Sequence, residues 1–141
     1  MPHPLLQQAS ALTGDVIAAA IEVHKHFGPG LIESVYEWAV VHELELRGHE
    51  CQAQQQVQVR YKGVAREFDL RYDVLVDRCL LVEVKAVENA LPVHKAQLIS
   101  YLKLLNVPLG LLFNFHEVKL TDGLTRLFLP GLREGEAKVH V

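Results

Sequence analysis

The first third of the chain has apolar residues at the three- and four-residue spacing of amphipathic helices. One helix is expected to be capped by Thr13, with Asp15 in its first turn, and to stop at Gly28-Pro29-Gly30. Its predicted buried stripe comprises Val16, Ala19, Ala20, Val23 and Phe27. A second helix is predicted from about Leu31 to Arg47. Its predicted buried stripe comprises Val35, Trp38 or Ala39, Leu44 and Leu46.

From residue 57 the spacing changes to the alternation that is typical of half-buried β-strands. Val57, Val59 and Tyr61 predict one such strand, and Lys62-Gly63 marks a turn after it. The next strand is expected to run from Val64 to Val76. Its core-facing side chains are predicted at even positions, namely Phe68, Leu70, Tyr72, Val74 and Val76. A turn at Asp77-Arg78 then leads to a further strand at residues 80–85.

The last third of the chain combines one helix with two strands. A helix is predicted from about Val93 to Leu105, after Pro92, and the continuous apolar run from Leu109 to Phe115 is typical of a buried strand. A last strand is expected from Leu124 to Leu129, and the tail from Glu134 is expected to fray. The order α-α-β-β-β-α-β-β predicts a mixed β-sheet flanked by helices, in an α/β or α+β domain.

Composition and charge limit the kinds of partner this chain can have. Its 141 residues favour a single domain, and half of them are hydrophobic, which is enough for a substantial core. The formal net charge of -3 provides no overall basic field, so a nucleic acid would need a local patch or a metal ion. No apolar run is long enough to cross a membrane. The two cysteines, Cys51 and Cys79, favour reduced thiols and a cytoplasmic location.

Three charged residues on the central strands share one predicted face. Asp73, Glu83 and Lys85 are odd-numbered, whereas the apolar positions of both strands are even-numbered. If the even positions face one core, the paired residues have numbers that add up to an even value. The loop between the strands must then contain an odd number of residues or a bulge, and Asp73 is expected opposite or diagonal to Glu83.

Two carboxylates held this close repel each other unless a cation lies between them. Mg²⁺ or Mn²⁺ prefers such oxygen ligands, and the backbone carbonyl of Val84 could add another. A bound metal would polarise a phosphate and activate water, and Lys85 could orient that water or stabilise developing charge. Alternatively, alternating charged and apolar residues simply mark a solvated sheet face. Asp69 is the second candidate ligand if the register differs.

Four motifs in a fixed order resemble one protein family. They are Gly30 to Tyr36 (GLIESVY), Asp73 with Glu83-Val84-Lys85, Gln97 to Tyr101 (QLISY), and the apolar strand Gly110 to Phe115. Together they resemble the GxxExxY family of the PD-(D/E)XK nuclease superfamily, over about Val16 to Leu129. The chain departs from the superfamily pattern in one place, since Tyr72 replaces the proline before Asp73. The resemblance implies a restriction-endonuclease-like core in a single domain spanning residues 1–141.

The resemblance also implies a role for each matching residue. Asp73 and Glu83 would be metal ligands, Lys85 would be the catalytic lysine, and Glu33 would approach the same site and could help to bind the metal. Gln97 and Tyr101 lie one helical turn apart and would support the site or contact the substrate. Tyr36, from the GxxExxY motif, is a further candidate for substrate binding, although such a residue is more often part of the core. Glu37, four residues after Glu33, is expected on a solvated helix face.

Two functional hypotheses follow, with a third that is purely structural. The first is a Mg²⁺- or Mn²⁺-dependent nuclease that hydrolyses phosphodiester bonds, with DNA as the expected substrate. Its expected local phosphate contacts are Lys62, Arg66, Arg71, Lys95 and Lys103. The second is a catalytically inactive module of the same fold that binds nucleic acid or a protein partner. The third, a standalone structural domain, would leave Lys85 and the paired carboxylates unexplained. A homodimer formed through an exposed strand edge is also compatible with the sequence.

Overall fold

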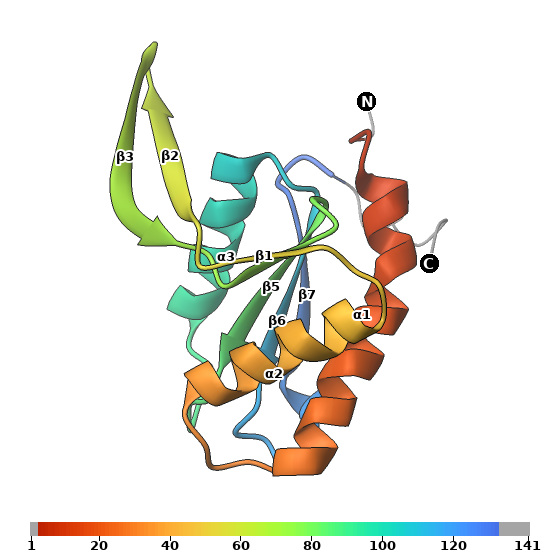
Figure 1. Cartoon of the computed structure of the whole chain (residues 1–141). Coiled ribbons are helices and arrows are strands. Elements are labelled where there is room, and N and C mark those ends of the chain that lie inside the picture. The colour runs from red at the N-terminus through yellow and green to blue at the C-terminus, as the bar shows by residue number, and fades with distance from the viewer. Residues whose placement is uncertain (1–2, 133–141) are drawn as a thin grey trace.

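The computed structural model describes residues 3–132 and contains a central five-stranded sheet with helices on both faces (Figure 1). The predicted tail from Glu134 lies outside these residues. The helices are α1 (Leu6–Phe27), α2 (Glu33–Leu46), α3 (Pro92–Leu105) and the short 3-10 helix η1 (Leu120–Gly123). The strands are β1 (Cys51–Ala53), β2 (Gln56–Tyr61), β3 (Val64–Arg71), β4 (Val74–Val76), β5 (Leu80–Lys85), β6 (Leu109–Asn114) and β7 (Leu124–Phe128).

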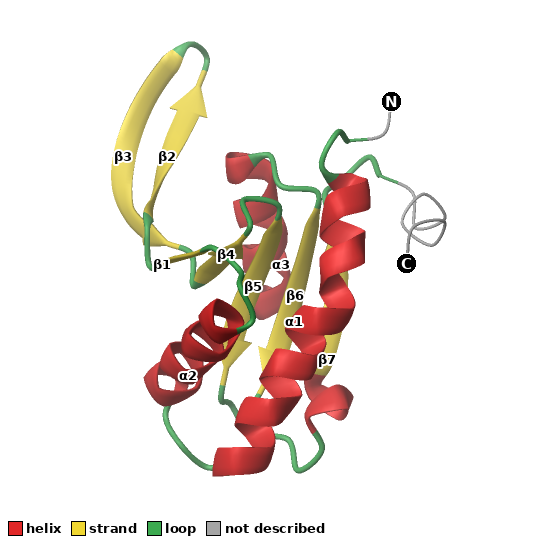
Figure 2. Cartoon of the chain, turned by 45° about the vertical axis from the view of Figure 1, so that its right-hand side comes forward, coloured by secondary structure: helices red, strands yellow, loops and turns green. Residues whose placement is uncertain are grey.

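The central sheet has the strand order β1-β4-β5-β6-β7 and is mixed. Strands β5 and β6 are parallel, because the chain crosses over through α3 between them, and the other neighbouring pairs are antiparallel. Helices α1 and α2 cover one face of this sheet and α3 covers the other (Figure 2). The mixed sheet flanked by helices confirms the fold class predicted from the sequence.

Each face of β5 belongs to a different apolar layer. Leu80, Val82 and Val84 pack with α1 and α2, whereas Leu81 packs with α3. Strand β6 is buried along its whole length, which confirms that the run from Leu109 is an internal strand. Burial on both faces makes β5 and β6 the rigid centre of the domain.

In the pairing of β4 with β5, the numbers of paired residues add up to an even value, as predicted. Val74 is opposite Val82 and Val76 is opposite Leu80, so the loop contains three residues, 77–79. Asp77 and Arg78 have positive φ angles of 48° and 61°. Neither residue is glycine, so this tight loop is held in an uncommon backbone conformation.

Three details of the predicted helices are wrong: the cap at Thr13, the place of Asp15 in the first turn, and the burial of Leu46. Helix α1 begins at Leu6, so Thr13 is a buried mid-helix residue whose hydroxyl donates to the Ser10 carbonyl at 2.8 Å, and it caps nothing. In α2, Ala39 is the buried residue of the pair considered, whereas Trp38 is 66% exposed. Leu46 is also exposed, because it belongs to the last turn of α2 beside the solvent.

The single strand predicted from Val64 to Val76 is in fact two strands. The chain leaves the extended conformation at Tyr72-Asp73, and β3 pairs only with β2, in a separate two-stranded sheet. Phe68 and Leu70, predicted to face the core, are therefore exposed. Figures 1 and 2 show this hairpin projecting away from the central sheet. The short edge strand β1 was not predicted.

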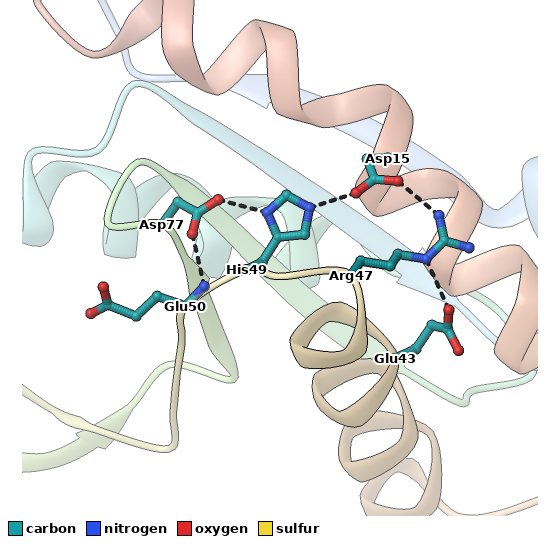
Figure 3. A network of polar contacts seen from close by, with 6 residues as sticks. All are labelled: Asp15, Glu43, Arg47, His49, Glu50 and Asp77. Carbon is teal, nitrogen blue, oxygen red and sulfur yellow. Dashed lines mark hydrogen bonds and ion pairs between the residues drawn. The ribbon is translucent and has the colours of Figure 1, made fainter.

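A polar network joins three segments that are distant in sequence (Figure 3). His49, just after α2, lies between two carboxylates: Nδ1 is 2.7 Å from Asp77 Oδ2 and Nε2 is 2.5 Å from Asp15 Oδ2. Arg47 forms ion pairs with Asp15 and Glu43 at 2.7 and 2.9 Å. These contacts connect α1, the segment leading to β1, and the loop between β4 and β5. Among residues 3–132, no helix is both long and apolar enough to span a membrane.

The network makes stability depend on pH in a defined direction. The hydrogen bond with Asp15, followed by that with Asp77, raises the pKa of His49 above its ordinary value of 6.5, and the same contact with His49 lowers the pKa of Asp15 below 3.8. The stabilisation by charged His49 is complete below pH 6.5 and is lost as pH rises through its raised pKa. The stabilisation by Asp15 is complete above pH 3.8 and is lost as pH falls through its lowered pKa.

We therefore expect His49→Gln to destabilise the fold by about 1–2 kcal/mol, because it removes two charge-assisted contacts that are partly exposed. Thermal unfolding at several pH values should show the largest difference from wild type between about pH 4 and 6.5. The difference should shrink in alkaline solution. His116→Gln, at an exposed histidine outside the network, is the matched control. A destabilisation that is the same at every pH would contradict the assignment.

Candidate functional site

The candidate site lies where regular β-structure is interrupted between β3 and β4, beside the end of β5. Asp73 continues the register of β4 and so lies across from Glu83. Its backbone N–H donates to Glu83 Oε1 at 3.2 Å, and its own Oδ2 accepts from the Val84 N–H at 2.8 Å. The two acidic side chains are thus fixed by hydrogen bonds to the partner strand.

Glu83 is a carboxyl group in an unusually apolar position. It is only 3% exposed, on the face of the sheet that α3 covers. Burial is the main cause that raises its pKa to about 9, and the negative charge of Asp73 and a hydrogen bond with the same side chain contribute to that shift. The positive charge of Lys85 acts in the opposite direction. At neutral pH a proton or a cation must therefore compensate this pair of carboxyl groups.

Two further acidic residues approach from α2. Glu33, the first residue of the helix, accepts from the Ala86 N–H at 3.3 Å, just beyond the end of β5. Glu37, one turn later, accepts from Gln54 Nε2 at 2.6 Å. The same amide group lies 3.2 Å from Asp73 Oδ1. Burial raises the pKa of Glu37, and the charges of Asp73 and Glu33 contribute to this shift.

Glu33, Glu37 and Asp73, but not Glu83, line one cavity. It has a volume of about 250 Å³ and is lined by Glu33, Ser34, Glu37, Gln54, Asp73 and Val84. Glu37 and Gln54 were missed by the sequence reasoning. The spacing of four residues between Glu33 and Glu37 was a usable signal, because it places both on one helix face. No local signal identified Gln54, which reaches the site only through the fold.

Helix α3, on the face of the sheet opposite α2, contributes a tyrosine. Tyr101 is buried, and its pKa is raised by burial and then by the charges of Glu83 and Asp73, whereas the Gln97 side chain lowers it. The structure therefore brings Gln97 and Tyr101 together, near the acidic pair. Tyr101 has a hydroxyl group that can donate a hydrogen bond in this region.

Lys85 points to a neighbouring space. It lines a second cavity of about 200 Å³, together with Lys95, Asn114, Asp122 and Thr125 among others. Its charge nevertheless acts on Glu83, two residues earlier on the same face of β5. The lysine is thus beside the carboxylates without lining the cavity that three of the acidic residues share.

Two other residues named from the sequence lie away from the cavity lining. Tyr36 is fully buried, stacked on Phe115 with ring centroids 4.5 Å apart. Its hydroxyl donates to the Gly28 carbonyl at 2.5 Å and accepts from the Leu31 N–H at 3.0 Å. Tyr36 therefore fixes the loop before Glu33. Asp69, the second candidate ligand, is exposed on β3.

The donor set is chemically suited to a hard divalent cation. Carboxylate oxygens are the preferred ligands of Mg²⁺ and Mn²⁺, and the buried Glu83, whose pKa is raised beside Asp73, gains from an added positive charge. Asp73 and Glu83 are the closest pair. Across residues 3–132, no group of three or more histidine, cysteine or acidic side chains has converged into a complete metal-ligand cluster.

One comparison with known proteins identifies a family. A protein-family model described as the PD-(D/E)XK nuclease superfamily matches residues 10–127. No curated protein matches the chain. The crystal structure of SSO0001 is similar over 97% of this chain and 81% of its own, at 15% identity and a TM-score of 0.44, which is too low to support an argument.

The matched superfamily comprises nucleases, which bind nucleic acid and generally use divalent metal ions. The mixed sheet with helices on both faces is consistent with its restriction-endonuclease-like fold. The match covers α1 to β7, and so includes every element that contributes to the site. The chain belongs to the PD-(D/E)XK nuclease superfamily.

Proposed function

We propose that this protein is a metal-dependent nuclease that hydrolyses phosphodiester bonds of nucleic acid, with DNA as its substrate and Mg²⁺ or Mn²⁺ as its cofactor. The observation that carries the proposal is the pairing of Asp73 with Glu83 across the β4–β5 register, with Glu83 buried and its pKa raised to about 9. Burying a carboxyl group beside a second one destabilises a fold. Such groups are therefore found mainly at functional sites.

The proposed roles of the residues are metal binding, orientation of Asp73 and contact with the substrate. Asp73 and Glu83 would hold the metal, and the Val84 carbonyl and Glu33 could add further ligands. When bound, the metal would polarise a phosphate oxygen and lower the pKa of a water molecule. Glu37 and Gln54 orient Asp73 through the shared amide of Gln54. Tyr101 and Gln97 close the site from α3 and are positioned to contact substrate.

Lys85 has a separate role in this proposal. It lines the second cavity together with Lys95, and the two cations would hold a phosphate there, although Glu117 and Asp122 also line that cavity. Lys85 stabilises the negative charge that develops on the phosphorus during attack. Because Val84 lines the first cavity and Lys85, the next residue of β5, lines the second, metal and phosphate would be held at the same end of this strand.

The proposal also includes the finer family and the cellular setting. We assign the chain to the GxxExxY branch, as one nuclease-like domain, on the GLIESVY segment, whose Glu33 reaches β5 and whose Tyr36 fixes the preceding loop. A cytoplasmic location is supported by Cys51 and Cys79, which are both free. Burial raises the pKa of both thiols to about 11, so both stay protonated and poorly reactive.

The direct test is metal binding and cleavage by Asp73→Asn and Glu83→Gln variants. Calorimetry should show Mn²⁺ affinity falling at least about tenfold, since loss of an outer hydrogen-bond partner alone typically costs 10–100-fold. Cleavage of plasmid and single-stranded DNA should fall by more than about 100-fold. Glu45→Gln makes the same chemical change at an exposed site on α2 and should change neither quantity.

The possible results separate the candidate functions. Metal binding without cleavage of any nucleic acid would favour the inactive module that binds nucleic acid or a protein partner. Metal binding that is unaffected by both substitutions would place the metal elsewhere and remove the basis of the proposed site.

Glu37 provides a test that the sequence did not suggest. The Glu37→Gln variant keeps an oxygen that can accept the Gln54 hydrogen bond but removes a negative charge from the cavity. We expect calorimetry to show Mn²⁺ affinity reduced by about tenfold, with circular dichroism unchanged. An affinity equal to that of wild type would show that Glu37 belongs only to the protein surface.

Lys85→Met separates metal binding from catalysis. Because Lys85 lines the neighbouring cavity and is not a ligand, Mn²⁺ affinity should stay within about threefold of wild type. The cleavage rate should fall by about 100- to 1,000-fold, as for loss of one group that stabilises transition-state charge. Lys25→Met, at an exposed residue of α1, is the control. Equal cleavage by Lys85→Met and wild type would exclude the catalytic role.

A further inference from the structure

The β2–β3 hairpin, residues 56–71, is the most exposed element of secondary structure in the described chain. All eight residues of β3 are exposed, and its strands pair only with each other. It projects as a long two-stranded arm beyond the central sheet (Figures 1 and 2). An isolated hairpin is at best marginally stable in water. We refer to it as the β2–β3 arm.

The arm has the opposite charge balance to the rest of the protein. It contains four basic side chains and two acidic ones, a net charge of +2, whereas the whole chain has a net charge of -3. The basic residues are Arg60, Lys62, Arg66 and Arg71. The basic patch that the overall composition does not provide is therefore concentrated on one projecting element.

One face of the arm combines aromatic rings with these cations. Tyr61 is paired with Val64, and Phe68 follows on the same face of β3. Tyr61 is 71% exposed and Phe68 is 46% exposed. The Lys62 ammonium lies 5.3 Å from the ring centre of Tyr61, and the Arg66 guanidinium lies 5.5 Å from that of Phe68. Exposed rings bordered by cations are the arrangement on which unpaired bases stack.

The base of the arm is continuous with the candidate site. Strand β2 begins two residues after Gln54, and β3 ends two residues before Asp73. Val57 and Tyr72 at this end are buried in the same apolar cluster as Leu98 and Tyr101 of α3. The arm is thus anchored next to the acidic pair at one end and free at the other.

We propose that the β2–β3 arm binds a single-stranded segment of DNA and leads it to the site formed by Asp73 and Glu83. This inference rests on the proposed nuclease function. Lys62 and Arg66 bind phosphates, and Tyr61 and Phe68 stack on unpaired bases. In a duplex the bases are stacked on one another. Only a locally single-stranded segment can therefore stack its bases on these rings.

A second copy of the chain is the alternative occupant of the arm, and charge argues against it. In a symmetric contact between two arms, the cations of both copies would approach one another. Like charges that face each other across paired strands are destabilising. A polyanion would instead neutralise Lys62 and Arg66 while covering the exposed rings.

The test is fluorescence anisotropy of a labelled single-stranded oligonucleotide and its duplex, in EDTA, so that binding is measured without catalysis. The variant Lys62→Glu with Arg66→Glu should bind the single strand at least about tenfold more weakly, with a shallower salt dependence. Tyr61→Ala with Phe68→Ala should weaken binding about 5- to 100-fold. Lys25→Glu with Lys119→Glu makes the same charge change at exposed positions outside the arm, and its affinity should stay within about twofold.

The outcomes distinguish this proposal from the proposed nuclease function. If wild type cleaves DNA and both arm variants bind and cleave with unchanged affinity and KM, the arm proposal is wrong and the nuclease stands. Binding that depends on the arm in a protein without cleavage would support the arm and refute the nuclease. A dimer in light scattering that becomes monomeric in the arm variants, with unchanged DNA affinity, would show a self-association surface instead. Thermal unfolding confirms that each variant is folded.

Discussion

The register between β4 and β5 is the constraint on which the site depends. A shift by one residue would turn every side chain of a strand to the opposite face. Glu83 would then enter the apolar layer under α1 and α2, and Val82 would face α3. The three-residue loop maintains the register, and Asp77 within it accepts hydrogen bonds from both His49 and the Glu50 N–H. The polar network of Figure 3, at the Asp77 end of β4, therefore supports the geometry of the site at the Asp73 end of the same strand.

This geometry concentrates negative charge where water is scarce. Glu83 is almost fully buried beside Asp73, and Glu33 and Glu37 approach from α2. Such an arrangement destabilises a fold unless each group is compensated, because desolvated like charges repel. Backbone N–H groups of Asp73, Val84 and Ala86 and the Gln54 amide compensate part of this charge. The raised pKa of Glu83 shows that compensation by the protein alone is incomplete, so the pair retains an affinity for a proton or a cation.

The sequence allowed the central strands to be predicted because their signals are local. The alternation of odd and even positions predicted that Asp73 lies opposite or diagonal to Glu83. The continuous run of apolar residues identified β6. The break at Tyr72-Asp73 was missed, because Phe68 and Leu70 alternate with polar residues as in any half-buried strand. What decides their exposure is the pairing partner of β3, which is β2 and not the central sheet. Gln54 was missed for the same reason, since only tertiary structure brings it to Glu37 and Asp73.

The same break explains why the site and the arm occur together. If β3 continued into β4 without interruption, Phe68 and Leu70 would lie in the sheet and their face would be covered by a helix. Because the chain turns at Tyr72-Asp73, Tyr72 is buried against α3, Asp73 is held by the Val84 N–H, and the whole of β3 up to Arg71 is exposed to solvent. An exposed two-stranded element contributes little to the core, so its sequence is free to serve binding. This interruption of the β-structure thus fixes the candidate ligand Asp73 and places the base of the basic β2–β3 arm next to it.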